Sequence, residues 1–173
     1  MQEMKDILCI YYSRTGNTKT AVEDIAKVLD AEVVEIHDNV ERNGIIGFIK
    51  SGMHASAKHP MHTIGFKTAR PLNEYRLVIV ASPVWAGRCC SPVRVFMRKH
   101  GKKFTNVCYV LTRGTSKRYE EVYEQLDQYT NTPHIEGVSL HCKGVGYHFW
   151  VEDFLTRVKG LLPTLKAPEP FEQ

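Results

Sequence analysis

Runs of apolar residues alternate along the chain with segments in which apolar residues recur every third or fourth position. Residues 7–12 (ILCIYY) are all apolar or aromatic, which is typical of a strand buried on both faces of a parallel sheet. In residues 17–29 the apolar positions share one helical face. The same two patterns recur downstream. They predict strands at about 6–12, 32–36, 76–82, 106–112 and 135–141, and helices at about 17–29, 91–100, 116–129 and 148–162.

Strands that alternate with helices indicate right-handed βαβ units and a parallel sheet. Because the helices then cover both faces, the predicted fold is an α/β three-layer, doubly wound sandwich. We expect residues 1–165 to form one domain, and residues 166–173 (KAPEPFEQ), which are proline-rich, to form a flexible tail. Residues 37–72 are less regular, with an amphipathic pattern at 45–49. This segment either shapes a pocket or forms a crossover helix with a surface loop.

Composition narrows the class of protein without identifying it. Of the 173 residues, 43% are hydrophobic and 24% are charged, as in ordinary globular domains. No apolar stretch is long enough to span a membrane, and the N-terminus lacks a secretory pattern, so we expect a cytoplasmic protein. The formal charge of +4 comes from scattered basic residues, which argues against nucleic-acid binding. Five cysteines without a C-x-x-C pair argue against a disulfide framework and favour reduced thiols.

The first predicted strand runs directly into a short loop that is rich in hydroxyl groups and opens the first helix. A glycine lets this loop turn tightly, so that backbone N–H groups converge on one point, and the helix directs the positive end of its dipole there. These features predict a phosphate-binding loop that needs no metal ion. The candidate residues are Ser13, Arg14, Thr15, Gly16, Asn17 and Thr18.

Two further loops follow the ends of predicted strands. In SPVWAG, after the strand at 76–82, Trp85 is expected on an exposed turn, where its flat face would stack on a planar ligand. The alternative is that Trp85 plugs the edge of the sheet. LTRGTS, after the strand at 106–112, supplies hydroxyl groups and a glycine before the next helix. Because the carboxyl ends of parallel strands meet at one edge, the three loops predict a site for a ligand with a phosphate tail and a flat ring.

SRTGNT after the first strand, SPVWAG after the third and LTRGTS after the fourth resemble the loops of the flavodoxin-like family, and the resemblance covers nearly the whole chain. It implies a five-stranded sheet of order 2-1-3-4-5, with flavin mononucleotide (FMN) across the switch point between the first and third strands. Residues 13–18 would hold the phosphate, and Trp85 would lie against one face of the ring. The residues implied to flank the ring are Pro83, Val84, Trp85, Ala86 and Gly87, and those implied to border its pyrimidine end are Thr112, Arg113 and Gly114.

The chain departs in two ways from the electron-carrier members of that family. Many small flavodoxins are strongly acidic and have a tyrosine in the third loop, whereas this chain is basic and LTRGTS contains no aromatic residue. Tyr119 is predicted one helical turn further on, and Tyr147 belongs to the last loop, so neither is assigned as a second stacking residue. A flavin ring open on one face would leave room for a nicotinamide or a quinone.

The resemblance therefore implies an FMN-binding redox protein that acts in electron transfer with a partner protein. The alternative is an FMN-dependent NAD(P)H oxidoreductase that reduces a quinone or another small acceptor, and a third interpretation is a regulatory module with this fold. In both flavoprotein interpretations the flavin carries the electron chemistry, and no side chain acts as a nucleophile. Arg113 would stabilise the anionic reduced flavin. Either a monomer or a homodimer that completes the pocket is compatible with the resemblance.

Other chemistries fit the sequence less well. Cys9 is one position too close to Arg14 for the anion loop of the low-molecular-weight phosphatases. No G-x-x-x-x-G-K-[ST] motif occurs, and GVGYHF lacks the third glycine of the dinucleotide fingerprint. Packing of small side chains explains the neighbouring Cys89 and Cys90 better than a redox role does. The histidines that might suggest a metal match no strong ligand spacing; they are His54, His59 and His62.

Overall fold

The computed structural model describes residues 3–39 and 63–168. Its sheet has five parallel strands in the order β2-β1-β5-β7-β8, and the short strand β6 pairs antiparallel with β5. The predicted α/β fold and the 2-1-3-4-5 strand order are confirmed. The strands are β1 (Ile7–Tyr11), β2 (Glu32–Glu35), β5 (Leu77–Trp85), β6 (Arg88–Cys89), β7 (Val107–Arg113) and β8 (Glu136–His141).

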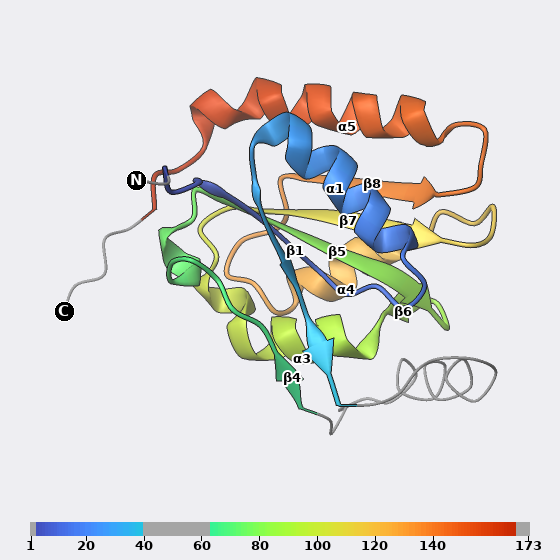
Figure 1. Ribbon diagram of the computed structural model, residues 1–173, viewed down its shortest axis with the longest axis horizontal. Coiled ribbons are helices and arrows are strands. Elements are labelled where there is room, and N and C mark those ends of the chain that lie inside the picture. The colour runs from blue at the N-terminus through green and yellow to red at the C-terminus, as the bar shows by residue number, and fades with distance from the viewer. Residues whose placement is uncertain (1–2, 40–62, 169–173) are drawn as a thin grey trace.

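Helices cover both faces of this sheet, which is why the strands read as continuous apolar runs (Figure 1). One core cluster lies between the sheet and the pair α1 and α5, and the other lies between the sheet and the pair α3 and α4. The helices are α1 (Asn17–Leu29), α3 (Ser91–His100), α4 (Glu121–Asp127) and α5 (Tyr147–Leu161), and the 3-10 turns are η1 (Leu72–Glu74), η2 (Gly101–Lys103) and η3 (Leu162–Thr164).

The connections on the two sides of β1 run in opposite directions. From β1 the chain passes through α1 to β2 at the sheet edge, and it later returns to β5 on the other side of β1. The register pairs Tyr11 with Ala81 and Pro83 with Thr112, so β1, β5 and β7 end at one edge of the sheet. The gap between β1 and β5 is thus the topological switch point, where open α/β sheets bind their ligands.

The segment 37–72 contains an element that the sequence pattern did not predict. β3 (His37–Asp38) and β4 (Ile64–Gly65) pair antiparallel in a separate two-stranded sheet. The Phe66 ring, just after β4, packs edge-to-face on Phe96 of α3 with ring centroids 5.1 Å apart. Two-residue strands carry too little alternation to be recognised from sequence. The amphipathic pattern predicted at 45–49 lies outside the described residues.

A polar side chain joins three segments at the amino edge of the sheet. The amide of buried Asn106, just before β7, donates to the Arg76 carbonyl oxygen at 2.8 Å and to the Lys166 carbonyl oxygen at 2.9 Å. Lys166 is the first residue of the predicted tail, so the chain is still held at that position. Residues 169–173, the end of that predicted tail, lie outside the described residues.

Candidate functional site

The loop after β1 turns at a glycine and opens α1. Gly16 is the N-cap of that helix with φ of 95°, a conformation that side chains disfavour, and its N–H donates to the Ser13 hydroxyl at 3.0 Å. Within the described residues no side chain caps α1, and its first turn contains no acidic residue. The positive end of the helix therefore suits an anion.

A buried hydroxyl pair ties this loop to the end of β7. Thr18 is 2% exposed, and its Oγ1 lies 2.7 Å from the Oγ1 of Thr112, 94 positions away in sequence. Either hydroxyl can be the donor. Since each hydroxyl has one proton and two acceptor lone pairs, the hydroxyl that accepts this bond keeps its own proton for another acceptor. The pair brings the first and third predicted loops together.

SPVWAG does not form the exposed turn that its sequence predicts. β5 continues through Trp85, and Val84 and Trp85 pair with Cys89 and Arg88 of β6. The turn itself consists of only two residues, Ala86 and Gly87, with φ of 49° and 73°. Two consecutive positive φ values are typical of the tight hairpin turn that matches strand twist. The prediction of a strand that ends near residue 82 was wrong, because the hairpin extends it.

Trp85 is half-buried at the end of this hairpin. Its ring meets Tyr12, the residue after β1, edge-to-face at a centroid distance of 5.6 Å and an interplanar angle of 89°. It also packs against the core cluster that α3 and α4 cover. This position lies beside the switch point, since Tyr12 follows β1 and Trp85 ends β5, the two strands that border it.

The loop after β7 is longer than predicted and is fixed by Arg113. The Arg113 Nε donates to the Ser139 hydroxyl at 3.0 Å, and its Nη1 donates to the Thr115 carbonyl oxygen at 2.6 Å. The Ser139 hydroxyl in turn donates to the Arg118 carbonyl oxygen. Burial and the nearby charge of Arg118 lower the pKa of Arg113. The guanidinium thus holds the loop against β8.

Residues 114–120 are not helical, so the predicted helix at 116–129 starts five residues too early. Tyr119 has φ of 56°, which a helix does not allow, and α4 begins at Glu121. The signal that sequence reasoning missed is the acidic pair Glu120 and Glu121, because acidic residues favour the first turn of a helix. The third loop therefore does contain an aromatic residue.

Tyr119 and Tyr147, the two tyrosines to which the sequence assigns no role, lie in different surroundings. Tyr119 is partly buried and packs in the same apolar cluster as Val84 and Trp85. The hydroxyl of Tyr147 donates to the Asp24 carboxylate of α1 at 2.7 Å, which ties α5 to α1. A positive φ on a bulky residue often marks a functional site. Tyr119 is therefore a site candidate, and Tyr147 acts between the helices.

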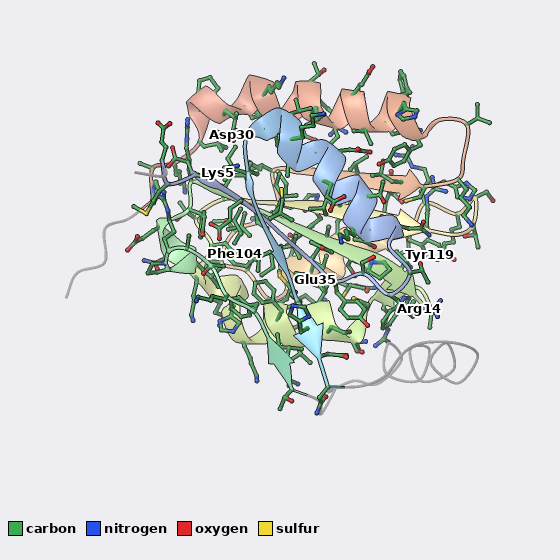
Figure 2. The ribbon with its side chains drawn as sticks, viewed as in Figure 1. Lys5, Arg14, Asp30, Glu35, Phe104 and Tyr119 are labelled. Atoms are coloured by element: carbon green, nitrogen blue, oxygen red, sulfur yellow. The ribbon has the colours of Figure 1, made fainter. Side chains whose placement is uncertain are left out.

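Arg14 of the first loop and Tyr119 of the third lie at the same end of the sheet, where the strands terminate (Figure 2). Three loops from the ends of β1, β5 and β7 are thus adjacent, as predicted. All fourteen predicted residues belong to these loops or to the strand ends that carry them. They are Ser13, Arg14, Thr15, Gly16, Asn17, Thr18, Pro83, Val84, Trp85, Ala86, Gly87, Thr112, Arg113 and Gly114.

Burial disfavours the reactive thiolate form of Cys9, Cys89 and Cys108. Burial raises the pKa of Cys9, inside β1, to about 12, which further disfavours the phosphatase alternative. Burial also raises the pKa of Cys89 to about 11, and Cys90 lies next to Ser82, whose Oγ accepts the Cys90 N–H at 2.9 Å. None of the five cysteines, all of which are described, is in a disulfide. Cys89 and Cys90 thus pack the base of the hairpin.

Residues 3–39 and 63–168 contain neither a metal-ligand cluster nor a membrane-spanning helix. No group of three histidine, cysteine, aspartate or glutamate side chains in these ranges is placed to hold a metal ion. None of the helices found there is both long and apolar enough to cross a membrane. His54, His59 and His62 lie outside the described residues.

Comparisons with known proteins agree on the architecture. No protein-family model and no curated protein matches this chain. A flavoprotein from Lactobacillus acidophilus, solved in complex with FMN, has a TM-score of 0.63 and 19% identity over 84% of this chain and 98% of its own. A flavodoxin, WrbA-like protein from Agrobacterium tumefaciens has a TM-score of 0.58 and 13% identity over 94% and 99%.

A flavodoxin from the domain Archaea is similar over 92% of this chain and 99% of its own, with 15% identity and a TM-score of 0.54. These neighbours span nearly the whole chain at identities too low to carry residue-level function. They resemble this chain in overall fold, and this chain has the strand order of a doubly wound, flavodoxin-like sandwich. The chain therefore has the flavodoxin-like fold.

Proposed function

We propose that this protein binds FMN at the switch point and acts in electron transfer. The observation that carries the proposal is the meeting of three loops there: the phosphate-type loop, the Trp85 hairpin and the Tyr119 loop. The bond between Thr18 and Thr112 joins the first and third loops, and Trp85 contacts Tyr12 and packs in the same cluster as Tyr119. A similar structure, the Lactobacillus acidophilus flavoprotein, was solved with FMN. The fold and the residues agree in pointing to a flavin nucleotide.

The first loop fits the phosphate of FMN by the chemistry of its donors. A phosphate dianion is matched by the uncapped end of α1, by backbone N–H groups of the turn at Gly16, and by the charge of Arg14. The shortage of acidic residues in the first helical turn removes a competing charge. The proposed phosphate ligands are Ser13, Arg14, Thr15, Gly16, Asn17 and Thr18.

The second and third loops fit the flat ring of the flavin. Trp85 offers an aromatic face held by Tyr12, and the backbone of Ala86 and Gly87 is free of bulky side chains. Thr112, Arg113 and Gly114 would border the pyrimidine end. Tyr119, which packs in the same cluster as Trp85, would be the second aromatic residue of the site. Pro83 and Val84 would complete the wall formed by the hairpin.

FMN, when bound, supplies the electron chemistry, and the chain orients it and sets the charge around it. The guanidinium of Arg113 is positioned by Ser139 and Thr115, so its positive charge is fixed at the edge of the proposed ring site. A fixed positive charge favours an anionic ring over a neutral one. The five free thiols fit a reducing, cytoplasmic compartment.

Tryptophan fluorescence tests the cofactor, because the chain has only Trp85 and Trp150. Titration with FMN should quench the emission, and Trp85→Phe should remove most of the quenching. Trp150→Phe is the matched control and should leave the quenching from Trp85 in place. A protein that neither quenches nor retains the yellow colour after removal of free FMN would contradict the proposal.

Anaerobic reduction then separates the two redox roles. The FMN-loaded protein is mixed first with NADPH and then with NADH while the flavin absorbance is followed. Persistent colour that fades only with dithionite supports a carrier that exchanges electrons with another protein. Prompt bleaching by either nucleotide would overturn the carrier proposal in favour of an NAD(P)H oxidoreductase.

A further inference from the structure

The turn between β8 and α5 presents apolar side chains to solvent. Val145 is fully exposed (108% relative exposure) and Phe149, in the first turn of α5, is 65% exposed. Only a few large apolar side chains among the described residues are exposed, and these two lie four positions apart. Exposed apolar residues that gather at one place often mark an interaction site.

This turn is well ordered. The Gly144 N–H donates to the His141 carbonyl oxygen at 2.8 Å, and the Trp150 N–H donates to the Gly146 carbonyl oxygen at 3.0 Å. A Cβ on Gly144 would lie 2.9 Å from the His141 ring, so the backbone sits directly on that ring. The exposure of Val145 is therefore built into a fixed turn.

The turn adjoins the candidate flavin site. The thiol of Cys142 lies 3.9 Å from the Asn17 carbonyl oxygen at the start of α1. On the other side, the Arg118 guanidinium of the third loop stacks over the Trp150 ring at 4.4 Å. Figure 1 shows the connections after β7 and β8 at the same end of the sheet. The exposed apolar residues are thus continuous with the loops proposed to hold FMN.

The positive charge of the chain is concentrated in the four loops that follow β1, β5, β7 and β8 at this edge of the sheet. Residues 13–20, 82–90, 113–121 and 141–149 together contain seven arginines and lysines and two glutamates, a formal charge of +5. The whole chain has 23 basic and 19 acidic residues, a charge of +4, so all remaining residues together carry −1. A bound FMN phosphate adds about −2 at neutral pH and leaves the edge positive. A field of this kind attracts acidic surfaces.

We infer that residues 143–149, with Lys117 and Arg118, form a docking surface for an acidic redox-partner protein. The inference rests on the proposed flavin function. Lys143 is exposed, and although Lys117 and Arg118 pair with Glu121 and Glu120 at 2.9 and 3.0 Å, the four loops together stay positive. A dinucleotide would match the charge but would leave Val145 and Phe149 uncovered. An apolar centre within a charged rim is the usual composition of a protein interface.

Two probes with the same haem and opposite surface charge test the inference. Cytochrome c is basic, and succinylation of its lysines makes it acidic. Added to the ¹⁵N-labelled full chain, with and without FMN, the succinylated form should shift the amide resonances of residues 117–118 and 143–149. These shifts should vanish at about 0.5 M salt. The native form should cause none.

Electron transfer from the FMN-loaded, dithionite-reduced protein gives a second readout. One reduced FMN should reduce two ferric haems and release its protons to solvent, faster with the succinylated form at low salt. Lys143→Glu should slow that reaction about three- to tenfold, and Val145→Ser should slow it less. The matched controls at the other end of the sheet are Lys102→Glu and Val28→Ser, which should leave the rate unchanged.

These experiments distinguish a failure of the docking surface from a failure of the proposed cofactor. The NMR titration needs no flavin, so a chain that fails to bind FMN but shows these shifts refutes the proposed cofactor and keeps the docking surface. Equal shifts with both forms of cytochrome c, shifts elsewhere on the chain, or equal slowing by Lys102→Glu and Lys143→Glu would overturn the inference. The same shifts caused more strongly by single-stranded DNA would replace the acidic protein with a nucleic acid.

Discussion

The two edges of the sheet are built differently. Five described residues have positive φ, and four of them, Gly16, Ala86, Gly87 and Tyr119, lie in loops at the carboxyl edge. The fifth, Asp30, ends α1 at the amino edge, where it caps the helix through its backbone and pairs with Lys5 at 3.0 Å. Figure 2 shows Lys5 and Asp30 at the end opposite to Arg14 and Tyr119.

This difference indicates that the carboxyl edge serves ligand binding and the amino edge serves stability. Backbone strain and like charges at the carboxyl edge lower stability, and such features persist where a ligand or partner requires them. The amino edge instead carries hydrogen bonds that join distant segments, such as those of Asn106. Substitutions at the amino edge should therefore change folding and leave ligand binding intact, whereas substitutions at the carboxyl edge should change ligand binding and have smaller effects on folding.

The largest expected effect is at the amino edge. Phe104, just before β7, is buried and stacks on Phe96 with ring centroids 5.9 Å apart. Phe104→Ala leaves a cavity and should lower the free energy of unfolding by about 3–5 kcal/mol, measured by urea denaturation. The Kd for FMN of the folded protein should stay unchanged. A Kd that rises along with the loss of stability would show that the two edges are not independent.

Asn106→Ala should have the next largest effect. It removes both hydrogen bonds of a buried side chain and leaves the carbonyl oxygens of Arg76 and Lys166 without that donor, at a cost of about 1–3 kcal/mol. Asn131→Ala is the control, since exposed Asn131 makes a comparable bond to the Lys102 carbonyl oxygen at 3.0 Å. The control should change the urea midpoint far less. Equal shifts in both variants would argue against a special role for the Asn106 junction.

Alanine substitutions at two glycines measure the effect of backbone strain at the site, with an ordinary helix position as the control. A Cβ would meet no atom within 4 Å at either Gly16 or Gly160, but only Gly16 has positive φ. Gly16→Ala should cost about 1–2 kcal/mol of stability and weaken FMN binding by about tenfold or more. Gly160→Ala in α5 should instead stabilise by about 0.5–1 kcal/mol and leave FMN binding unchanged. An unchanged Kd for Gly16→Ala would separate this turn from the phosphate site.

The smallest effect concerns the hydroxyl pair that joins two loops. Thr18→Val and Thr112→Val should each leave a buried hydroxyl unpaired, whereas the double variant removes both. A double-mutant cycle on unfolding should give a coupling of about 0.5–1.5 kcal/mol. Additive single effects would mean that the bond contributes nothing to stability.

The sheet could be predicted from sequence because buried parallel strands are continuous apolar runs. β1, α1 and α3 lie within a residue of their predicted bounds, and each has an unambiguous period. The Trp85 hairpin was missed because Pro83 and a two-residue turn look like the end of a strand. Only the three-dimensional structure reveals the positive φ of Tyr119 and the bond between Thr18 and Thr112, since both depend on contacts between distant segments.

The thiols of the chain differ in solvent exposure, and this difference allows one of them to be labelled selectively. Burial raises the pKa of Cys9 and Cys108 to about 12 and that of Cys89 to about 11, and Cys90 is also buried. Burial raises the pKa of Cys142 as well, but Cys142 alone is partly exposed, and it lies beside the start of α1. A maleimide should therefore modify the native chain once. The unmutated protein thus carries a built-in attachment point for a spin label or fluorophore that reports directly on the rim of the candidate site.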